Sequence, residues 1–127
     1  MLDERVLHEI EVKAAYGDIK EIVALLKTIL GQRITTLLSG RKDASVLELW
    51  ISGKERPNEV EDLRLRYGYH AAGILNAKYD SETARAILTS SNPILGDESL
   101  ICWLGDHEKE EDLRLALMVA LNDEMCS

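Results

Sequence analysis

The sequence has few of the residues that mark specialised protein classes. Only two of its 127 residues are proline, and no run approaches the roughly 18 uninterrupted apolar residues of a membrane-spanning helix. The two cysteines lack C-x-x-C spacing and are too few for a disulfide scaffold, so we expect a buried thiol at Cys102 and a tail thiol at Cys126. The first residues do not form the basic and then apolar start of a secretory signal. These absences predict a soluble cytoplasmic protein without a membrane segment.

The remaining composition is that of a folded domain. Hydrophobic residues make up 46% of the chain and charged residues 30%, which is typical of globular rather than disordered proteins. A chain of 127 residues is long enough for one domain with a single core and too short for two well-packed domains. We therefore expect one folded unit.

The net charge of −8 is unevenly distributed along the chain. Residues 1–31 contain four basic and six acidic side chains, and residues 32–66 contain seven basic and six acidic ones. Residues 67–127 contain four basic and eleven acidic side chains. This distribution argues against nonspecific binding of polyanions over the whole surface, but it leaves room for a local basic face in the middle segment.

Apolar residues recur with helical spacing, and no alternating strand pattern is present. The sequence therefore predicts an all-α fold, a single compact helical domain. We expect an N-terminal helix in residues 1–17, a helix-turn-helix-like part in 18–57 and a C-terminal helical part in 58–127. The apolar positions predict helices near 6–16, 22–30, 34–38, 44–51, 60–75, 84–88, 100–104 and 113–121.

Several helix starts carry capping signals. Asp18 and Glu21 stand at the spacing of a capping box, as do Asn58 and Glu61. Asp43 is expected to cap the helix at 44–51.

The sequence after the long helix expected at 60–75 also contains signals for the start of a helix and for a turn. Asp80 or Ser81 is expected to cap the next helix. Asn92 precedes Pro93, and a residue before proline is displaced from helical geometry. The sequence therefore predicts an abrupt corner at this pair.

A search for catalytic and metal-binding motifs finds no complete one. A P-loop needs glycine where the chain has Glu48, and a zinc-protease motif starting at His107 needs a second histidine where the chain has Glu111. His8 and His70 are far from His107 in sequence, and a histidine at the helical spacing of His70 is typical of a hydrogen-bonded core or boundary residue. We therefore predict no catalytic residue, metal or cofactor, and we expect a protein that is not an enzyme.

Residues 32–51 have the length of a helix-turn-helix, in which the second helix enters the DNA major groove. Glu48 lies on that second helix and is expected to be repelled by phosphates, whereas Trp50 is expected to belong to the core. Basic side chains that flank the second helix are candidates for phosphate contacts. The predicted DNA-binding residues are Arg33, Arg41, Lys42, Ser45, Lys54 and Arg56.

Three stretches together resemble a known family. They are "LGQRITTLLSGRKDASVLELWISGKERP", then "LRLRYGYHAAGIL" and then "SETARAILTSSNPILGDESL", and they span about residues 29–104. Their order is similar to that of helix-turn-helix antitoxins with an Xre/MbcA/ParS-type toxin-binding domain. The matching steps are Trp50-Ile51-Ser52-Gly53 and the corner with the serine after it, Asn92-Pro93-Ile94-Leu95-Gly96-Asp97-Glu98-Ser99.

The resemblance implies a dimeric antitoxin and autorepressor. Its N-terminal helical part would bind operator DNA, and its C-terminal part would block a toxin, often one that consumes NAD. The corner would orient the partner-binding element. The residues that the resemblance assigns to partner binding are Asn92, Pro93, Leu95 and Ser99.

One departure from the family keeps a second hypothesis open. Recognition helices of the family tend to be rich in arginine or lysine, whereas this chain places Glu48 there. The alternative to a DNA-binding regulator is a helical interaction module with a degenerate helix-turn-helix, whose acidic face docks onto a basic partner. An unrecognised enzyme is a third hypothesis, because helical pockets are not visible in one sequence.

Overall fold

A computed structural model describes residues 3–126 of the chain and the side chains of residues 3–121. The described residues form helices joined by short turns, and their nearest approach to a strand is an isolated bridge between Ser91 and Ser99. The prediction of an all-α single domain is confirmed. The elements are α1 (Glu4–Tyr16), α2 (Ile19–Leu30), α3 (Gln32–Ser39), α4 (Ser45–Ser52), α5 (Glu59–Lys78), α6 (Ser81–Thr89), the 3-10 turn η1 (Pro93–Leu95), α7 (Leu100–Asp106) and α8 (Glu110–Cys126).

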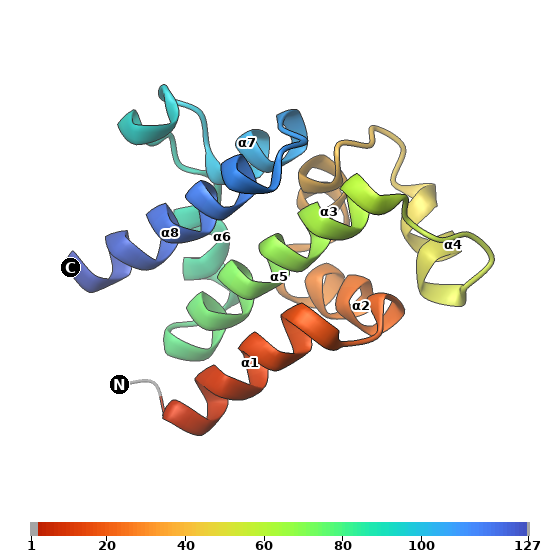
Figure 1. The fold of residues 1–127 in the computed structure, drawn as a ribbon, viewed down its shortest axis with the longest axis horizontal. Helices are drawn as coiled ribbons and strands as arrows, with labels where there is room; N and C mark the ends of the chain where they lie inside the picture. The colour runs from red at the N-terminus through yellow and green to blue at the C-terminus, as the bar shows by residue number, and fades with distance from the viewer. Residues whose placement is uncertain (1–2, 127) are drawn as a thin grey trace.

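Helix α5 runs through the middle of the molecule, with α1 and α8 along either side of it (Figure 1). It also packs against α2, α3, α6 and α7, so most of the other helices meet on one central element. Helix α4 lies at the edge and packs mainly against α2. The helix pair α3–α4 and the C-terminal helices therefore share a single core built on α5.

The composition of α5 explains its central position. Leu65 and Leu75 are fully buried, and two glycines on the same helix allow close approach of its neighbours. A Cβ atom on Gly68 would come within 3.0 Å of the Leu38 side chain, and one on Gly73 within 3.0 Å of Ile10. Burial of each leucine side chain stabilises the fold by about 1.5–3 kcal/mol. A helix that buries residues on several faces can serve as the core of a small domain.

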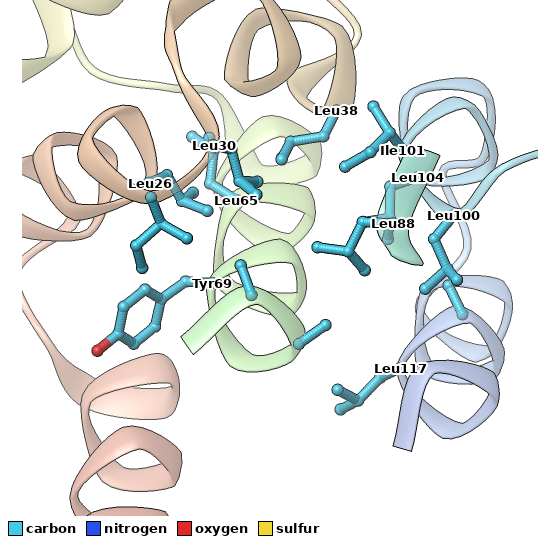
Figure 2. Close-up of a cluster of buried hydrophobic side chains, with 14 of the residues drawn as sticks. Leu26, Leu30, Leu38, Leu65, Tyr69, Leu88, Leu100, Ile101, Leu104 and Leu117 are labelled. Carbon is cyan, nitrogen blue, oxygen red and sulfur yellow. The ribbon is translucent and has the colours of Figure 1, made fainter. Parts of the chain in front are cut away.

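Figure 2 shows how the core fills the space beside α5. Leu26 and Leu30 of α2 point toward α5 from one side, and Leu88 of α6 and Leu104 of α7 lie on the other. All four are buried together with Leu65 of α5. The core is therefore continuous from the helix-turn-helix-like part to the C-terminal part.

The two predicted capping boxes have different outcomes. The box at Asn58 and Glu61 is confirmed, because each side chain accepts a hydrogen bond from the backbone of the other. Asp18 caps α2 by accepting from the amide two residues further on. Its partner Glu21 instead accepts from Lys13 Nζ at 2.7 Å, so the prediction of a reciprocal box at α2 is wrong.

Two other predicted caps have different outcomes. Helix α4 begins at Ser45, one residue later than predicted, so Ala44 and not Asp43 is the N-cap residue, and no side chain makes a capping bond there. Asp43 instead accepts a hydrogen bond from the Ser45 amide at 3.0 Å from one position before the cap. The open choice at α6 is decided for Asp80, whose side chain accepts from the Thr83 amide at 2.7 Å.

Two expectations about burial also have different outcomes. Trp50 is completely buried, as expected for a core indole. The prediction that Cys102 is a buried thiol is wrong, because this side chain is exposed. The buried face of α7 belongs to Leu100, Ile101 and Leu104, so the position between them points outward. The side chain of Cys126 lies outside the described residues.

Candidate DNA-binding and partner-binding surfaces

A tight turn joins α3 to α4 and is shaped by Gly40. This residue has φ 89° and ψ 0°, the left-handed conformation that favours glycine at a helix end. A Cβ atom there would lie 2.5 Å from Arg64 Nη1 and 3.1 Å from the Gly105 carbonyl oxygen. Arg64 is held in place because it donates hydrogen bonds to the carbonyl oxygens of Ser39 and His107 at 3.1 and 2.9 Å. The turn is therefore positioned by α5 and α7.

The predicted DNA-binding side chains are all exposed, but they lie in four places along the chain. Arg33 is at the start of α3, Lys42 is in the turn, and Lys54 and Arg56 follow α4. Ser45 begins α4. A helix of eight residues is about 12 Å long, so the cations before α4 and those after it stand at its opposite ends. The assignment of these residues to DNA stays a prediction.

Arg41 differs from the other predicted DNA contacts because it already has a protein partner. Its guanidinium donates a hydrogen bond to the buried carboxylate of Glu61 and lies 5.7 Å from the centroid of the Trp50 ring. Burial alone acts to raise the pKa of Glu61, but the hydrogen bonds from Arg41 and from the Asn58 amide hold that pKa below its ordinary value. Arg41 therefore connects the α3–α4 turn to the start of α5.

Glu48 is also engaged within the protein. Lys27 Nζ of α2 donates to Glu48 Oε1 at 2.5 Å, although both side chains are partly exposed. This ion pair offsets the charge that was expected to repel DNA, but exposed pairs of this kind contribute little to stability. The sequence did not reveal the pair, because Lys27 lies 21 residues before Glu48 on another helix.

A hollow of about 390 Å³ separates the start of α2 from the end of α4. Arg56 lines it together with Lys20, a cation that was not predicted to contribute to a basic face. Asp18 and Glu55 line it as well, so the positive charges are balanced. The Trp50 ring forms part of the wall, and its Nε1 is buried without a hydrogen-bond partner among the described protein atoms. Lys20 and Arg56 therefore lie at the same hollow in the folded protein, although their separation in the sequence does not predict this.

The corner between α6 and α7 is a closed loop with its own hydrogen bonds. The Asn92 amide donates to the Glu98 carbonyl at 3.0 Å, and the Asp97 amide donates back to the Asn92 carbonyl at 2.9 Å. The Asn92 side chain accepts from the Ile94 amide at 2.9 Å. Gly96 and Asp97 both have positive φ values, 65° and 68°, and they turn the chain back. The abrupt corner predicted at residues 92–93 is thus confirmed.

The side chains of the predicted partner-binding residues face in different directions. Asn92 and Leu95 are buried and hold the corner in shape. Pro93 is exposed, and Ser99 is half-buried and caps α7 through the amide three residues further on. Ile94, which the sequence argument did not select, is 66% exposed. At this corner, the apolar surface open to a partner therefore consists of Pro93 and Ile94.

The acidic half of the chain places many carboxylates on the surface. They lie in the turns around α6 and α7 and at the start of α8, and basic residues in these segments are few. The exposed acidic residues are Asp80, Glu82, Asp97, Asp106, Glu108, Glu110 and Glu111.

Two further searches of the described part of the chain give negative results. Its histidine, cysteine and carboxylate side chains form no group of three or more that could hold a metal ion. None of its helices combines the length and the apolar character needed to cross a membrane. In comparisons with known proteins, no family model matches the chain, and no curated protein or solved structure matches it.

Proposed function

We propose that this chain is a non-enzymatic, antitoxin-like transcriptional regulator that acts in the cytoplasm as a homodimer. It binds operator DNA through α3–α4 and a toxin-like protein through its acidic C-terminal half. The observation that carries the proposal is the division of the surface, with exposed cations at both ends of α4 and exposed carboxylates around α6, α7 and the start of α8. The sequence resemblance described above supplies the type of partner.

The roles of the DNA-facing residues follow from their positions. Lys42 precedes α4, and Lys54 and Arg56 follow it, so these cations reach phosphates on both sides of the helix. Ser45 stands at the exposed start of α4, where its hydroxyl group meets a base edge. Helix α4 itself carries no basic residue, so most of the affinity comes from phosphate contacts.

A second candidate function is favoured by two contacts. Arg41 is bound to Glu61, and Glu48 occupies the exposed face of α4 together with Lys27. Because of these contacts, fewer positively charged groups of the helix pair are available to bind DNA phosphates. Under this alternative the chain is a helical interaction module whose helix-turn-helix has become degenerate, and only the acidic half binds a partner.

The first experiment is capture of the tagged protein from its host at low salt without nuclease, with identification of the bound protein and DNA. A small enzyme retained in a fixed ratio, together with DNA from one locus, supports the regulator. A protein partner without DNA selects the interaction module. If DNA from one locus is captured without a protein, the chain is a repressor without a toxin-like partner. If neither DNA nor a protein is captured, the proposal is contradicted.

A salt titration then tests the DNA surface. Each phosphate that the protein neutralises contributes about −0.9 to the slope of log affinity against log salt concentration. Lys42→Ala is expected to reduce the steepness of that slope by about 0.9. Lys109→Ala removes an exposed cation between α7 and α8 and serves as the matched control, with an unchanged slope. Equal slopes for the two variants would show that Lys42 does not contact a DNA phosphate and would contradict the proposed DNA-binding surface.

The partner surface is tested by charge insertion at the corner. Ile94→Arg places a cation on the exposed apolar tip, and it is expected to weaken partner binding at least tenfold. Val12→Arg is the matched control, because Val12 is also partly exposed but lies on α1. A partner that binds both variants as it binds the unmodified protein does not use the corner.

A further inference from the structure

Helix α1 lies at the edge of the molecule and packs mainly against α5 (Figure 1). Its inner residues Ile10 and Ala14 are buried, and its flank toward α8 borders a cavity of about 480 Å³ beside His70. The outer face carries Val12 and Tyr16, which are 43% and 86% exposed. An aromatic side chain buries about 150–250 Å² when it is packed, so Tyr16 leaves a large aromatic surface in water.

The exposed side chains of α1 form a stripe along its outer face. The stripe consists of Arg5, Glu9, Val12 and Tyr16, which recur every three or four residues and therefore point to the same side of the helix. Lys13 lies next to the stripe. A shallow hollow of about 500 Å³ runs along this side, and Glu9, Val12 and Lys13 contribute to its lining. The face thus combines an exposed ring, a hollow and charges of both signs.

This face is complementary to a second copy of itself that runs in the opposite direction. In an antiparallel pair of α1 helices, Arg5 of each copy lies beside Tyr16 of the other, and Glu9 lies beside Lys13. The midpoints of these two pairs along α1 differ by less than about 1 Å, so one two-fold axis serves both. A guanidinium beside an aromatic ring and an ion pair are both attractive contacts. A symmetric dimer requires such self-complementarity, because both copies use the same patch.

The charge of the protein restricts where a second copy can dock. Each chain has a net charge of −8, and the exposed carboxylates around α6, α7 and the start of α8 would repel the same surface of another copy. The stripe with Lys13 instead holds two cations and one carboxylate. Lys13 Nζ donates to Glu21 at 2.7 Å and has further N–H groups for a second acceptor. The outer face of α1 therefore avoids the repulsion between acidic surfaces.

We propose that the outer face of α1 binds the same face of a second copy in an antiparallel arrangement, which specifies the homodimer of the proposed function and rests on it. Val12 of each copy enters the hollow of the other, close to the two-fold axis. A helix of 13 residues is about 20 Å long, so the contact is smaller than a standard interface of about 1,600 Å². The expected dissociation constant is on the order of 10 µM.

The first test is sedimentation equilibrium of the full chain at concentrations from about 1 to 300 µM. The mass is expected to rise from 14.3 kDa toward twice that value. Tyr16→Ala is expected to weaken the dimer at least tenfold, because it removes the exposed ring and its contact with Arg5. Met118→Ala is the matched control. It removes another exposed side chain, on α8 at the other side of α5, and should dimerise as the unmodified chain does.

Exchange of charges tests the antiparallel pairing. Glu9→Lys alone and Lys13→Glu alone each place like charges opposite one another twice in the dimer, so each is expected to weaken association at least tenfold. An equimolar mixture of the two variants restores both ion pairs and is expected to associate about as tightly as the unmodified chain. A mixture of Glu59→Lys and Lys109→Glu has the same net charges at exposed positions outside α1. This control should associate no more tightly than the unmodified chain.

The outcomes separate this interface from the rest of the proposed function. If the chain dimerises and Tyr16→Ala dimerises equally well, the α1 interface is overturned while the homodimer stands. A chain that is monomeric even at about 300 µM overturns both. A mixture of the two charge variants that does not recover association also overturns the interface. Val12→Arg is expected to be monomeric and still to bind the toxin-like protein, because each copy has its own corner at Ile94.

Discussion

Arg41 Nε donates a hydrogen bond to Glu61 Oε2 across a separation of twenty residues. The other oxygen of the same carboxylate accepts from the Asn58 amide at 2.9 Å, so one buried side chain both caps α5 and holds the α3–α4 turn. A side chain predicted to contact DNA is thus also part of the junction between the helix-turn-helix-like part and the central helix. Its substitution is therefore expected to lower the stability of the fold, whether or not the side chain contacts DNA.

Arg41→Ala is expected to lower the free energy of unfolding by about 1–3 kcal/mol, because it leaves the Glu61 carboxylate buried without its cation. Urea denaturation followed by circular dichroism measures the loss. The same substitution in a Glu61→Gln background should cost less, and Arg33→Ala, at an exposed arginine, should cost almost nothing. Equal losses in both backgrounds would show that the pair is not coupled.

The same junction predicts a dependence of stability on acid. The pKa of Glu61 is held below its ordinary value of 4.5, so the unfolded chain takes up this proton first as the pH falls. The stability contributed by the pair is therefore complete above about pH 4.5 and is lost as the pH falls through the lower pKa of the folded state. Glu61→Gln should remove this part of the acid sensitivity.

Gly40 and Gly53 form a matched pair for testing the turn. Both end a helix in the left-handed conformation, with φ values of 89° and 80°. Gly53→Ala should cost about 1 kcal/mol for the conformation alone, because the nearest atom to the new Cβ is the mobile Lys20 chain at 3.3 Å. Gly40→Ala should cost about 1–3 kcal/mol more, because the new Cβ displaces Arg64. Similar losses in urea denaturation would contradict this account.

Trp50 combines complete burial with an indole N–H that has no hydrogen-bond partner among the described protein atoms. Trp50→Phe removes the unpaired donor along with some packing, so the two effects partly cancel and the loss of stability should stay below about 1.5 kcal/mol. Trp50→Ala should cost about 3–5 kcal/mol because it leaves a large cavity. Urea denaturation followed by circular dichroism compares the variants, and a larger loss for Trp50→Phe would indicate that the indole N–H has a partner.

His70 predicts a second pH effect, near neutrality. Burial lowers its pKa from the ordinary value of 6.5, while nearby Glu11 acts in the opposite direction. The unfolded chain therefore binds a proton at this site before the folded chain does, so stability declines as the pH falls below about 6.5. Comparison of urea denaturation near pH 7.5 and pH 5 measures the decline. His70→Gln should reduce it, whereas His8→Gln, on the outer face of α1, should not.

Much of the fold follows from local sequence. Helical periodicity locates the helices, and Asn58 and Asp80 mark two of their starts by bonding to amides only three residues away. The corner at Asn92 and Pro93 is local as well, because proline restricts the residue before it and the loop closes within a few residues. These features depend on neighbours in the chain, which is why the sequence alone predicts them.

The surfaces depend on contacts between distant residues, and the sequence does not reveal those contacts. The pairing of Arg41 with Glu61 and of Lys27 with Glu48 joins different helices, and the capping box at Asp18 is incomplete because Glu21 turns toward Lys13 on α1. A long charged side chain can form an ion pair with any of several residues, and the packing of the helices determines which of these residues lies close enough.

The sequence by itself thus determined an all-α chain, the approximate helix positions and the chemical types available on each segment. Only the tertiary structure decided which of those groups are free. It placed Arg41 against Glu61, turned Leu95 inward and Ile94 outward, and left the imidazole of His70 beside a cavity. The physical reason is that helix formation is governed by residues within about one turn, whereas burial and ion pairing are set by how complete helices pack.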